Sequence, residues 1–190
     1  MTTNADVQTT EVPGLTAGTW TIDPSHTDVS FTVRHLMVSK VRGSFTRFDG
    51  TIVIAEDPLA SSVEASVDLS SIDTRDENRD AHLRSADFFE TETYPTMTFR
   101  STKVRRAGSD FAVEGELSLH GVTRPVQLDL EFNGVSADPW GGTRAGFSAE
   151  TEINRRDFGI DISMPLDGGG VVVGDKVKVH LEIEAVLQSN

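Results

Sequence analysis

The sequence contains no cysteine, which excludes disulfide bonds, thiolate metal sites and cysteine nucleophiles. Positive charge is also scarce, because 17 lysines and arginines stand against 30 aspartates and glutamates and leave a formal net charge of −13. Such a chain is not expected to bind nucleic acid or an anionic membrane through its overall charge. A locally basic patch could still hold one anionic headgroup, because net charge does not fix the field inside a cleft.

Long apolar runs are missing as well. No segment approaches the ~18 consecutive apolar residues of a membrane-spanning helix, so an integral membrane protein is not predicted. Residues 1–17 lack the basic start and apolar core of a secretory signal, and their polar, Thr-rich composition predicts a disordered tail. We therefore expect a cytoplasmic protein with one domain over residues 18–188. This domain is long enough to bury a hydrophobic core without the support of disulfide bonds or metal ions.

Known catalytic motifs are absent or incomplete. The triplet Asp157-Phe158-Gly159 also occurs in protein kinases, but the glycine-rich and His-Arg-Asp loops of those enzymes are missing. The glycine-rich segment 167–174 has no Gly-Lys-Ser/Thr and is predicted to form a hairpin or a loop at the mouth of the fold. With no Gly-x-Ser-x-Gly or His-Glu-x-x-His either, the sequence predicts no catalytic residue and no metal site.

The five histidines do not have the spacing of a metal site, although Asp80 and His82 could converge with a third group. His35 differs from the others, because the alternation of its strand directs it toward the interior. A buried histidine needs a hydrogen-bond partner or a polar ligand. His35 is therefore either a satisfied core histidine or a ligand contact.

Alternation of polar and apolar residues is the main pattern from Thr19 onward. Val29, Phe31 and Val33 share one face of a strand, and Ser30 lies on the other. The same period of two recurs in residues 41–54, 63–69, 97–103, 111–119, 126–132, 145–153 and 177–187. This gives about eight strands, and their wet and dry faces favour an antiparallel sheet over parallel βαβ units.

Two features favour a closed barrel. The parity of the apolar residues changes between Phe45 and Phe48, which predicts a β-bulge or a sharp bend there. Glycines also fall inside strands, where they permit tight coiling; they are Gly43, Gly50, Gly115 and Gly146. A closed barrel avoids exposed edges, and a flatter sandwich with ordinary turn glycines remains the alternative.

One short helix is predicted over residues 78–90, because Thr74 and Glu77 have the spacing of a capping box. We expect it to lie across one end of the barrel as a plug or lid, with Leu83, Phe88 and Phe89 directed inward. A surface helix that covers a sheet edge fits the sequence equally well.

Five segments, taken in order, closely resemble the YceI-like family: residues 20–45, 71–89, 94–99, 117–126 and 153–160. The Gly-x-Trp at 18–20 is also similar to the start of lipocalins. The resemblance covers about residues 18–188 and implies an extended, lipocalin-like antiparallel barrel whose long apolar cavity takes a polyisoprenoid or similar lipid. The matching positions are His26, His35, Gly43, Phe45, Asp80, His82, Leu83, Phe88, Pro95, Gly121, Arg155, Asp157, Phe158 and Gly159.

The barrel and the resemblance together predict a protein that binds or carries a long-chain lipid and is not an enzyme. A bound lipid is the one cofactor-like group expected, and a homodimer through a barrel edge is a further expectation. A self-filled interaction module, or an enzyme built on His35, Asp80 and His82, are the alternatives. The predicted ligand-binding residues are Phe31, Val33, His35, Phe45, Phe48, Leu83, Phe88, Phe89, Phe99, Leu119, Leu130, Phe147, Arg155 and Phe158.

Overall fold

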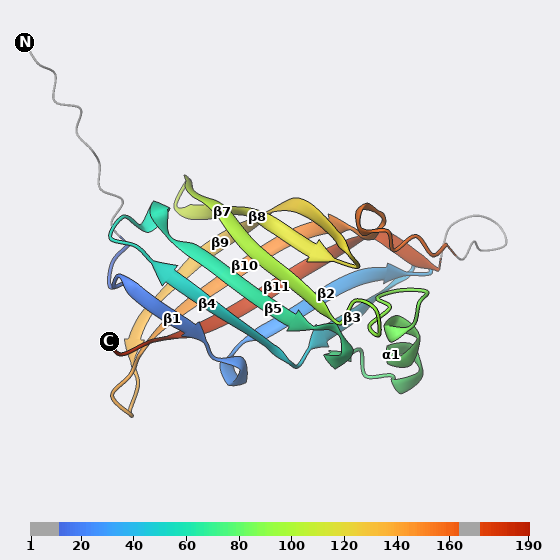
Figure 1. Ribbon diagram of the computed structural model, residues 1–190, viewed down its shortest axis with the longest axis horizontal. Coiled ribbons are helices and arrows are strands. Elements are labelled where there is room, and N and C mark those ends of the chain that lie inside the picture. Colours follow the sequence, from blue (N-terminus) through green and yellow to red (C-terminus); the bar gives the residue numbers. More distant parts are fainter. Residues whose placement is uncertain (1–11, 164–171) are drawn as a thin grey trace, which may run out of the picture.

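The computed structural model describes residues 12–163 and 172–190 and shows one antiparallel sheet closed into a barrel (Figure 1). Its strands are β1 (Gly18–Ile22), β2 (Asp28–His35), β3 (Ser39–Phe45), β4 (Phe48–Ile54), β5 (Ser62–Asp68), β6 (Ile72–Asp73), β7 (Thr96–Ala107), β8 (Asp110–Leu119), β9 (Val122–Ala137), β10 (Thr143–Asn154) and β11 (Val173–Leu187). The helical segments are α1 (Glu77–Arg84), η1 (Pro24–His26), η2 (Pro58–Ala60), η3 (Leu69–Ser71) and η4 (Arg155–Phe158). The glycine-rich segment 167–174 lies mostly outside the described residues.

Closure comes from a second pairing of β1. The neighbours run β1-β4-β5-β7-β8-β9-β10-β11, and β1 also pairs with β11, so these eight strands form a ring. Because β11 pairs with β2 along its first part and with β1 at its end, β1 and β2 are two halves of one strand separated by η1. The predicted antiparallel barrel of about eight strands is confirmed.

The bend predicted between Phe45 and Phe48 separates β3 from β4. There the amides of Thr46 and Arg47 donate to the Ser71 hydroxyl at 3.1 and 3.0 Å. Both amides are therefore hydrogen-bonded, although they do not pair with a neighbouring strand. Both phenylalanines consequently face the barrel interior, which the change of parity required.

Two strand glycines make room for aromatic rings. A Cβ atom at Gly43 or at Gly115 would overlap the ring of Phe31 or of Phe99, which lies over the glycine on the neighbouring strand. A third, Gly146, marks a register shift between β9 and β10. The glycines therefore permit close packing and bending inside the barrel.

Two hydrophobic clusters lie toward the two ends of the interior. The α1-side cluster consists of Phe45, Val67, Leu69, Ile72, Phe88, Leu117, Leu119, Phe158 and Ile160. The β1-side cluster consists of Trp20, Ile22, Ile52, Ile54, Ala145, Phe147 and Ala185. Leu15 packs against the β1-side cluster, and the Trp20 indole donates to the Thr16 carbonyl at 3.1 Å. Within the described residues the fold thus begins before residue 18, while residues 1–11 lie outside them.

The helix is shorter than predicted. α1 spans Glu77–Arg84, and Phe88 and Phe89 follow it in turns rather than on the helix. Asp76, not Thr74, caps the N-terminus by accepting from the Arg79 amide at 3.0 Å. The helix stops because the amide of the extended residue Ser85 returns to the His82 carbonyl. No helix in the described ranges is long and apolar enough to cross a membrane.

The segment from α1 to β7 fills a gap in the barrel wall. β5 pairs with β7 only as far as Asp68, and beyond that point β6 pairs with β3 alone. α1 packs beside β6 at this end of the barrel (Figure 1). Leu83 and Phe89 pack against the α1-side cluster, which includes Phe88. The segment therefore plugs the end of the barrel and also covers an edge, which combines the two arrangements that the sequence allowed.

One arginine ties three segments together at the opposite end. Arg144 lies 2.7 Å from Asp23, 3.0 Å from Asp138 and 3.0 Å from Glu184. The hydrogen bond from Arg144 is the largest of the causes that hold the pKa of Asp23 well below its usual range, and Arg144 also helps to lower the pKa of Asp138 after the Gly142 amide. The cluster therefore stabilises the folded state only while the carboxylates are charged.

Replacing Arg144 with glutamine should lower stability at neutral pH and flatten its acid dependence. A carboxylate with a depressed pKa in the fold stabilises it above its unfolded pKa of about 3.9, and this contribution fades as the pH falls toward the lower folded pKa. The denaturation midpoints of wild type and Arg144→Gln should thus differ at neutral pH and converge below about pH 4. Lys178→Gln removes the same charge at a position that forms no ion pair with described residues, and it serves as the control. If the denaturation midpoints of Arg144→Gln and wild type differ by the same amount at every pH, the role of Arg144 is contradicted.

Candidate functional site

A partly open cavity of about 210 Å³ lies in the barrel interior, and residues of both hydrophobic clusters line it. Every strand of the closed ring contributes to its wall, because inward-facing positions alternate along each strand. The lining residues are Val12, Leu15, Ile22, Thr27, Val29, Phe48, Asp49, Ile52, Ile54, Pro58, Ser61, Ser62, Val63, Ala65, Val67, Met97, Thr98, Phe99, Val104, Phe111, Val113, Leu117, Val126, Leu128, Leu130, Phe132, Phe147, Ala149, Thr151, Ile153, Val179, Leu181 and Ile183.

The lining is almost wholly apolar. Asp49 is its only charged residue among the described positions, and its other polar members are threonines and serines. A cavity of this kind favours hydrocarbon, because a charged or amide-rich ligand would lose hydrogen bonds to water without replacing them. The cavity is therefore suited to an apolar tail rather than to a polar metabolite.

Several inward-facing aliphatic residues are only half-buried. Val126, Leu128, Val179 and Leu181 alternate with outward polar residues on β9 and β11, yet each keeps part of its surface accessible. In the α1-side cluster, by contrast, Leu119 is 4% and Phe158 is 1% exposed. The accessible surface of the four aliphatic residues faces the cavity, so this part of the barrel is not filled by its own side chains.

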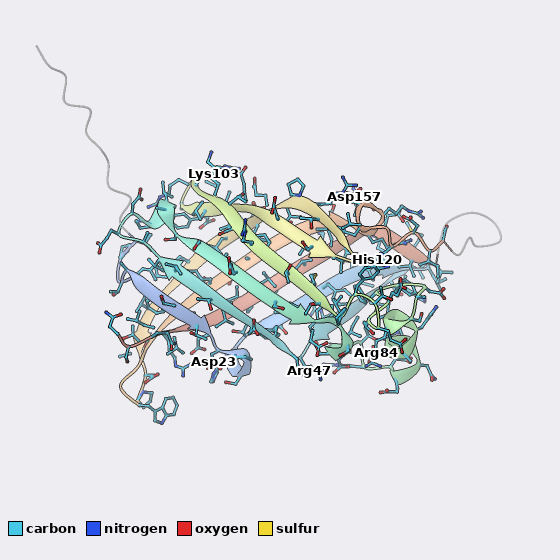
Figure 2. The ribbon with its side chains drawn as sticks, in the orientation of Figure 1. Asp23, Arg47, Arg84, Lys103, His120 and Asp157 are labelled. Carbon is cyan, nitrogen blue, oxygen red and sulfur yellow. The ribbon has the colours of Figure 1, made fainter. Side chains whose placement is uncertain are left out.

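Side-chain hydrogen bonds join the segments at the α1 end of the barrel. Arg84 donates from Nε to the Ser70 carbonyl at 3.1 Å, which holds α1 on the barrel. On the other side of this end, the His120 imidazole donates from Nδ1 to the Phe158 carbonyl at 3.0 Å and joins the β8–β9 turn to η4. Figure 2 shows both side chains at the α1 end, whereas Lys103 lies on the outer surface away from it.

The other end is bordered by less regular structure. Pro58, Ser61 and Ser62, in and next to η2, line the cavity there together with Val12 and Leu15. Residues 12–17 and η2 lie at the end of the barrel opposite α1 (Figure 1). The Ser61 hydroxyl accepts from the Ala55 amide at 3.1 Å. A polar headgroup would meet hydroxyl groups at this end and packed phenylalanines at the other.

Of the fourteen residues predicted to bind a ligand, the cavity wall contains Phe48, Phe99, Leu130 and Phe147. The α1-side cluster, with its packed neighbours, contains Phe31, Phe45, Leu83, Phe88, Phe89, Leu119 and Phe158. Phe45 lies at the meeting point of this cluster, with ring centroids 5.7 Å from Phe31 and 6.0 Å from Phe89. These aromatic residues therefore form the plug beside the cavity and contact one another.

Val33 and His35 lie half-buried on β2, outside both the cavity wall and the α1-side cluster. Val33 pairs with Val41 and Val177 on the neighbouring strands. His35 is the last residue of β2, where its main chain pairs with Ser39. The structure thus places His35 near a hairpin turn rather than beside the space for a ligand.

Arg155 is buried, with 5% of its surface exposed, but its guanidinium is used within the protein. Nη1 donates to the Ile160 carbonyl at 2.7 Å and Nε to the Gly174 carbonyl at 3.0 Å, while Nη2 lies 3.1 Å from Asp175. Burial lowers the pKa of Arg155, and the charge of Asp175 opposes that change. Arg155 therefore fastens η4 to the start of β11.

The residues considered for an enzyme or a metal site do not come together. Asp80 is 5% exposed and accepts from the amide and hydroxyl of Thr74 at 2.9 and 2.6 Å. His82 instead lies 2.8 Å from Asp87. Neither these residues nor His35 line the cavity, and the described ranges contain no cluster of three potential metal ligands.

Sequence reasoning missed most of the aliphatic wall, including Val126, Leu128, Val179, Leu181 and Ile183. Their alternation already marked them as inward-facing. The alternation of inward and outward positions along every strand would have identified these residues, if aliphatic residues had been considered equally with aromatic ones. Which inward residues meet a cavity and which meet one another depends on packing between distant strands.

The comparisons with known proteins agree with this geometry. The model of the YceI-like domain matches residues 20–185. Protein YceI of Escherichia coli is 46% identical over 136 residues, which cover 71% of each chain. A UPF0312 protein of Vibrio cholerae is 44% identical over 142 residues, covering 73% of this chain and 74% of that protein.

Solved structures share the fold. The crystal structure of a Campylobacter jejuni YCEI protein matches with a TM-score of 0.69 and 29% identity, over 88% of this chain and 96% of that one. Burkholderia cenocepacia BcnA matches with a TM-score of 0.75 and 21% identity, over 86% and 98%. A polyisoprenoid binding domain from Saccharophagus degradans matches with a TM-score of 0.69 and 18% identity, over 91% and 100%. Sequence match and barrel together establish that this chain belongs to the YceI-like family.

Proposed function

We propose that this protein binds a long-chain amphiphilic lipid, a polyisoprenoid or a similar molecule, with the tail inside the barrel, and sequesters or carries it. The observation that carries the proposal is the cavity inside the barrel, lined from all eight strands by apolar side chains. The polyisoprenoid binding domain of Saccharophagus degradans, which has the same fold, supports this ligand class.

Apolar burial would drive binding at about 25 cal/mol per Å², or about 0.8 kcal/mol per methylene, offset by the cost of immobilising the tail. Leu130 and Phe147 would contact the tail on one wall, and Phe48 and Phe99 on others. Phe88 and Phe89 would act indirectly, by keeping the α1 end closed. We propose no catalytic step, because none of His35, Asp80 and His82 lines the cavity.

Native mass spectrometry of protein purified from its own source, followed by organic extraction, tests the ligand class. A stoichiometric lipid with a long apolar tail would support the proposal and identify the headgroup. Protein that carries no lipid and also fails to bind added isoprenoids would contradict it and favour an interaction module.

Affinity should depend more on tail length than on headgroup. In a series of isoprenoid alcohols, each methylene that enters the cavity should contribute about 0.8 kcal/mol, so binding should strengthen roughly fourfold per methylene until the cavity is full. Exchange of the alcohol for a phosphate should change affinity less than the loss of one isoprene unit. Tryptophan fluorescence or calorimetric titration measures both, and affinity that follows the headgroup alone would contradict binding in the cavity.

A further inference from the structure

The hairpin between β2 and β3 carries three exposed apolar side chains at its tip. Leu36 is 38%, Met37 is 52% and Val38 is 85% exposed. These residues, called the hairpin tip below, follow one another in the chain and project beyond the strands. Single exposed apolar residues are common on protein surfaces, whereas a continuous exposed group indicates a contact surface.

The backbone of the hairpin tip has an unfavourable sequence for its shape. Leu36 and Met37 both have positive φ, at 52° and 60°, and the Val38 amide donates to the His35 carbonyl at 3.2 Å. Turns with positive φ at both central residues favour Asn and Gly, because a larger side chain is strained there. A bulky apolar pair in these positions costs stability, which indicates that the side chains have a use outside the fold.

Basic residues flank the hairpin tip on the outward face of the two strands. Arg34 lies directly opposite Lys40, and Arg42 lies opposite Thr32. All three basic residues are exposed, and none forms an ion pair with a described residue. Like charges directly opposite each other destabilise a sheet, and here they stand in a chain with a net charge of −13. The hairpin is therefore locally basic, although the chain as a whole is acidic.

We propose that the hairpin tip docks the protein on an anionic membrane surface. Leu36, Met37 and Val38 would enter the region between headgroups and acyl chains, while Arg34, Lys40 and Arg42 contact lipid phosphates. Apolar residues at a tip with basic residues behind them match the layers of a bilayer, in which hydrocarbon lies beneath anionic headgroups. Nucleic acid offers the phosphates without the hydrocarbon, so a membrane is the occupant that fits both the apolar tip and the basic residues behind it.

The hairpin tip is joined to the chain that leads into β11. The Leu36 amide donates to the Val172 carbonyl at 2.9 Å, which joins the tip to the chain just before β11. Figure 1 shows the β2–β3 hairpin extending to the same end of the barrel as α1. Docking through this tip would therefore bring the α1 end toward the membrane.

Sedimentation with lipid vesicles tests the proposal, using phosphatidylcholine vesicles with and without a third of phosphatidylglycerol. The full chain should bind the anionic vesicles, and added salt should weaken binding. The double variant Leu36→Asn/Met37→Gly should lose roughly tenfold in partitioning. Its thermal midpoint should stay equal or rise, because these residues suit the turn. Arg34→Gln/Lys40→Gln should lower binding to anionic vesicles by roughly tenfold and leave the weaker binding to neutral vesicles unchanged.

Val53 and Trp140 provide matched controls, because each is an exposed apolar residue outside the hairpin tip, at 43% and 81% exposure. Val53→Asn and Trp140→Ser should bind vesicles as the wild type does. A wild type that does not bind anionic vesicles, or a turn variant that binds them normally, would overturn the proposal. Lipid extraction from the Leu36→Asn/Met37→Gly variant keeps the two proposals apart, since cavity ligand should remain bound when docking is lost.

Discussion

Replacing Leu128 with tryptophan is expected to weaken the binding of long-chain lipid strongly while the protein remains folded. Leu128 lines the cavity from β9 and is only half-buried, so a larger side chain can grow into empty space. If the indole displaces two or three methylenes of the tail, the loss is about 2 kcal/mol, or roughly thirtyfold in affinity. Filling a cavity tends to stabilise a protein, so the denaturation midpoint should stay or rise. Lipid titration and chemical denaturation measure the two effects.

The neighbouring residue provides the control for this experiment. Gln127 faces outward on the same strand, where its side chain accepts from Arg105 at 2.8 Å. Gln127→Trp adds an indole of the same size to the outer face and should leave lipid affinity within about twofold, because an exposed hydrogen bond contributes little. Normal lipid binding by a folded Leu128→Trp variant would show that the ligand lies elsewhere.

Replacing Arg155 with methionine is expected to destabilise the protein strongly without a matching loss of lipid affinity. The change removes buried hydrogen bonds to the carbonyls of Ile160 and Gly174 and leaves both acceptors without that donor. Loss of charge-assisted bonds with buried acceptors left behind costs about 2–4 kcal/mol. In the folded variant, lipid affinity should change by less than about threefold, because Arg155 does not line the cavity. Urea denaturation measures the loss of stability. Lipid titration at temperatures well below the thermal midpoint of the variant measures the affinity of the folded protein.

Arg156 offers a matched comparison. It is the adjacent arginine and lies 2.8 Å from the same Asp175, but 36% of its side chain is exposed. Arg156→Met should therefore cost less than about 1 kcal/mol. A stable Arg155→Met variant that no longer binds an anionic lipid would return Arg155 to the role of headgroup contact that the sequence suggested.

Cellular location and dimerisation remain predictions from the sequence. The proposed docking of the hairpin tip depends on neither location nor dimerisation, because the tip belongs to a single chain. The vesicle experiment measures its binding to membranes directly. A dimer through the tip would appear as loss of self-association in Leu36→Asn/Met37→Gly, in a sedimentation measurement without lipid.

The sequence by itself determined the barrel. Alternation with a period of two is a local property, so the strands, their inward faces and the bend between Phe45 and Phe48 could be predicted from neighbouring residues. The same patterns, together with the ordered segments of the YceI-like family, indicated an apolar interior. The extent of the helix was less predictable, because Asp76 displaced Thr74 as the cap and Ser85 ended it early.

Tertiary structure alone decided which inward residues line a cavity. Phe45, Phe88 and Phe158 have the same apolar character as Phe99 and Phe147, yet the first three belong to the α1-side cluster without lining the cavity, whereas the last two line it. The segments that form this plug lie far apart in the sequence. They meet at the end of the barrel where β5 and β7 no longer pair, beside α1 and η4, and Arg155 fastens η4 to the start of β11. Hydrophobic burial is non-directional and rewards contact with any apolar neighbour. The pattern along one strand therefore indicates that a side chain points inward, and only the packing of distant segments determines what it meets there.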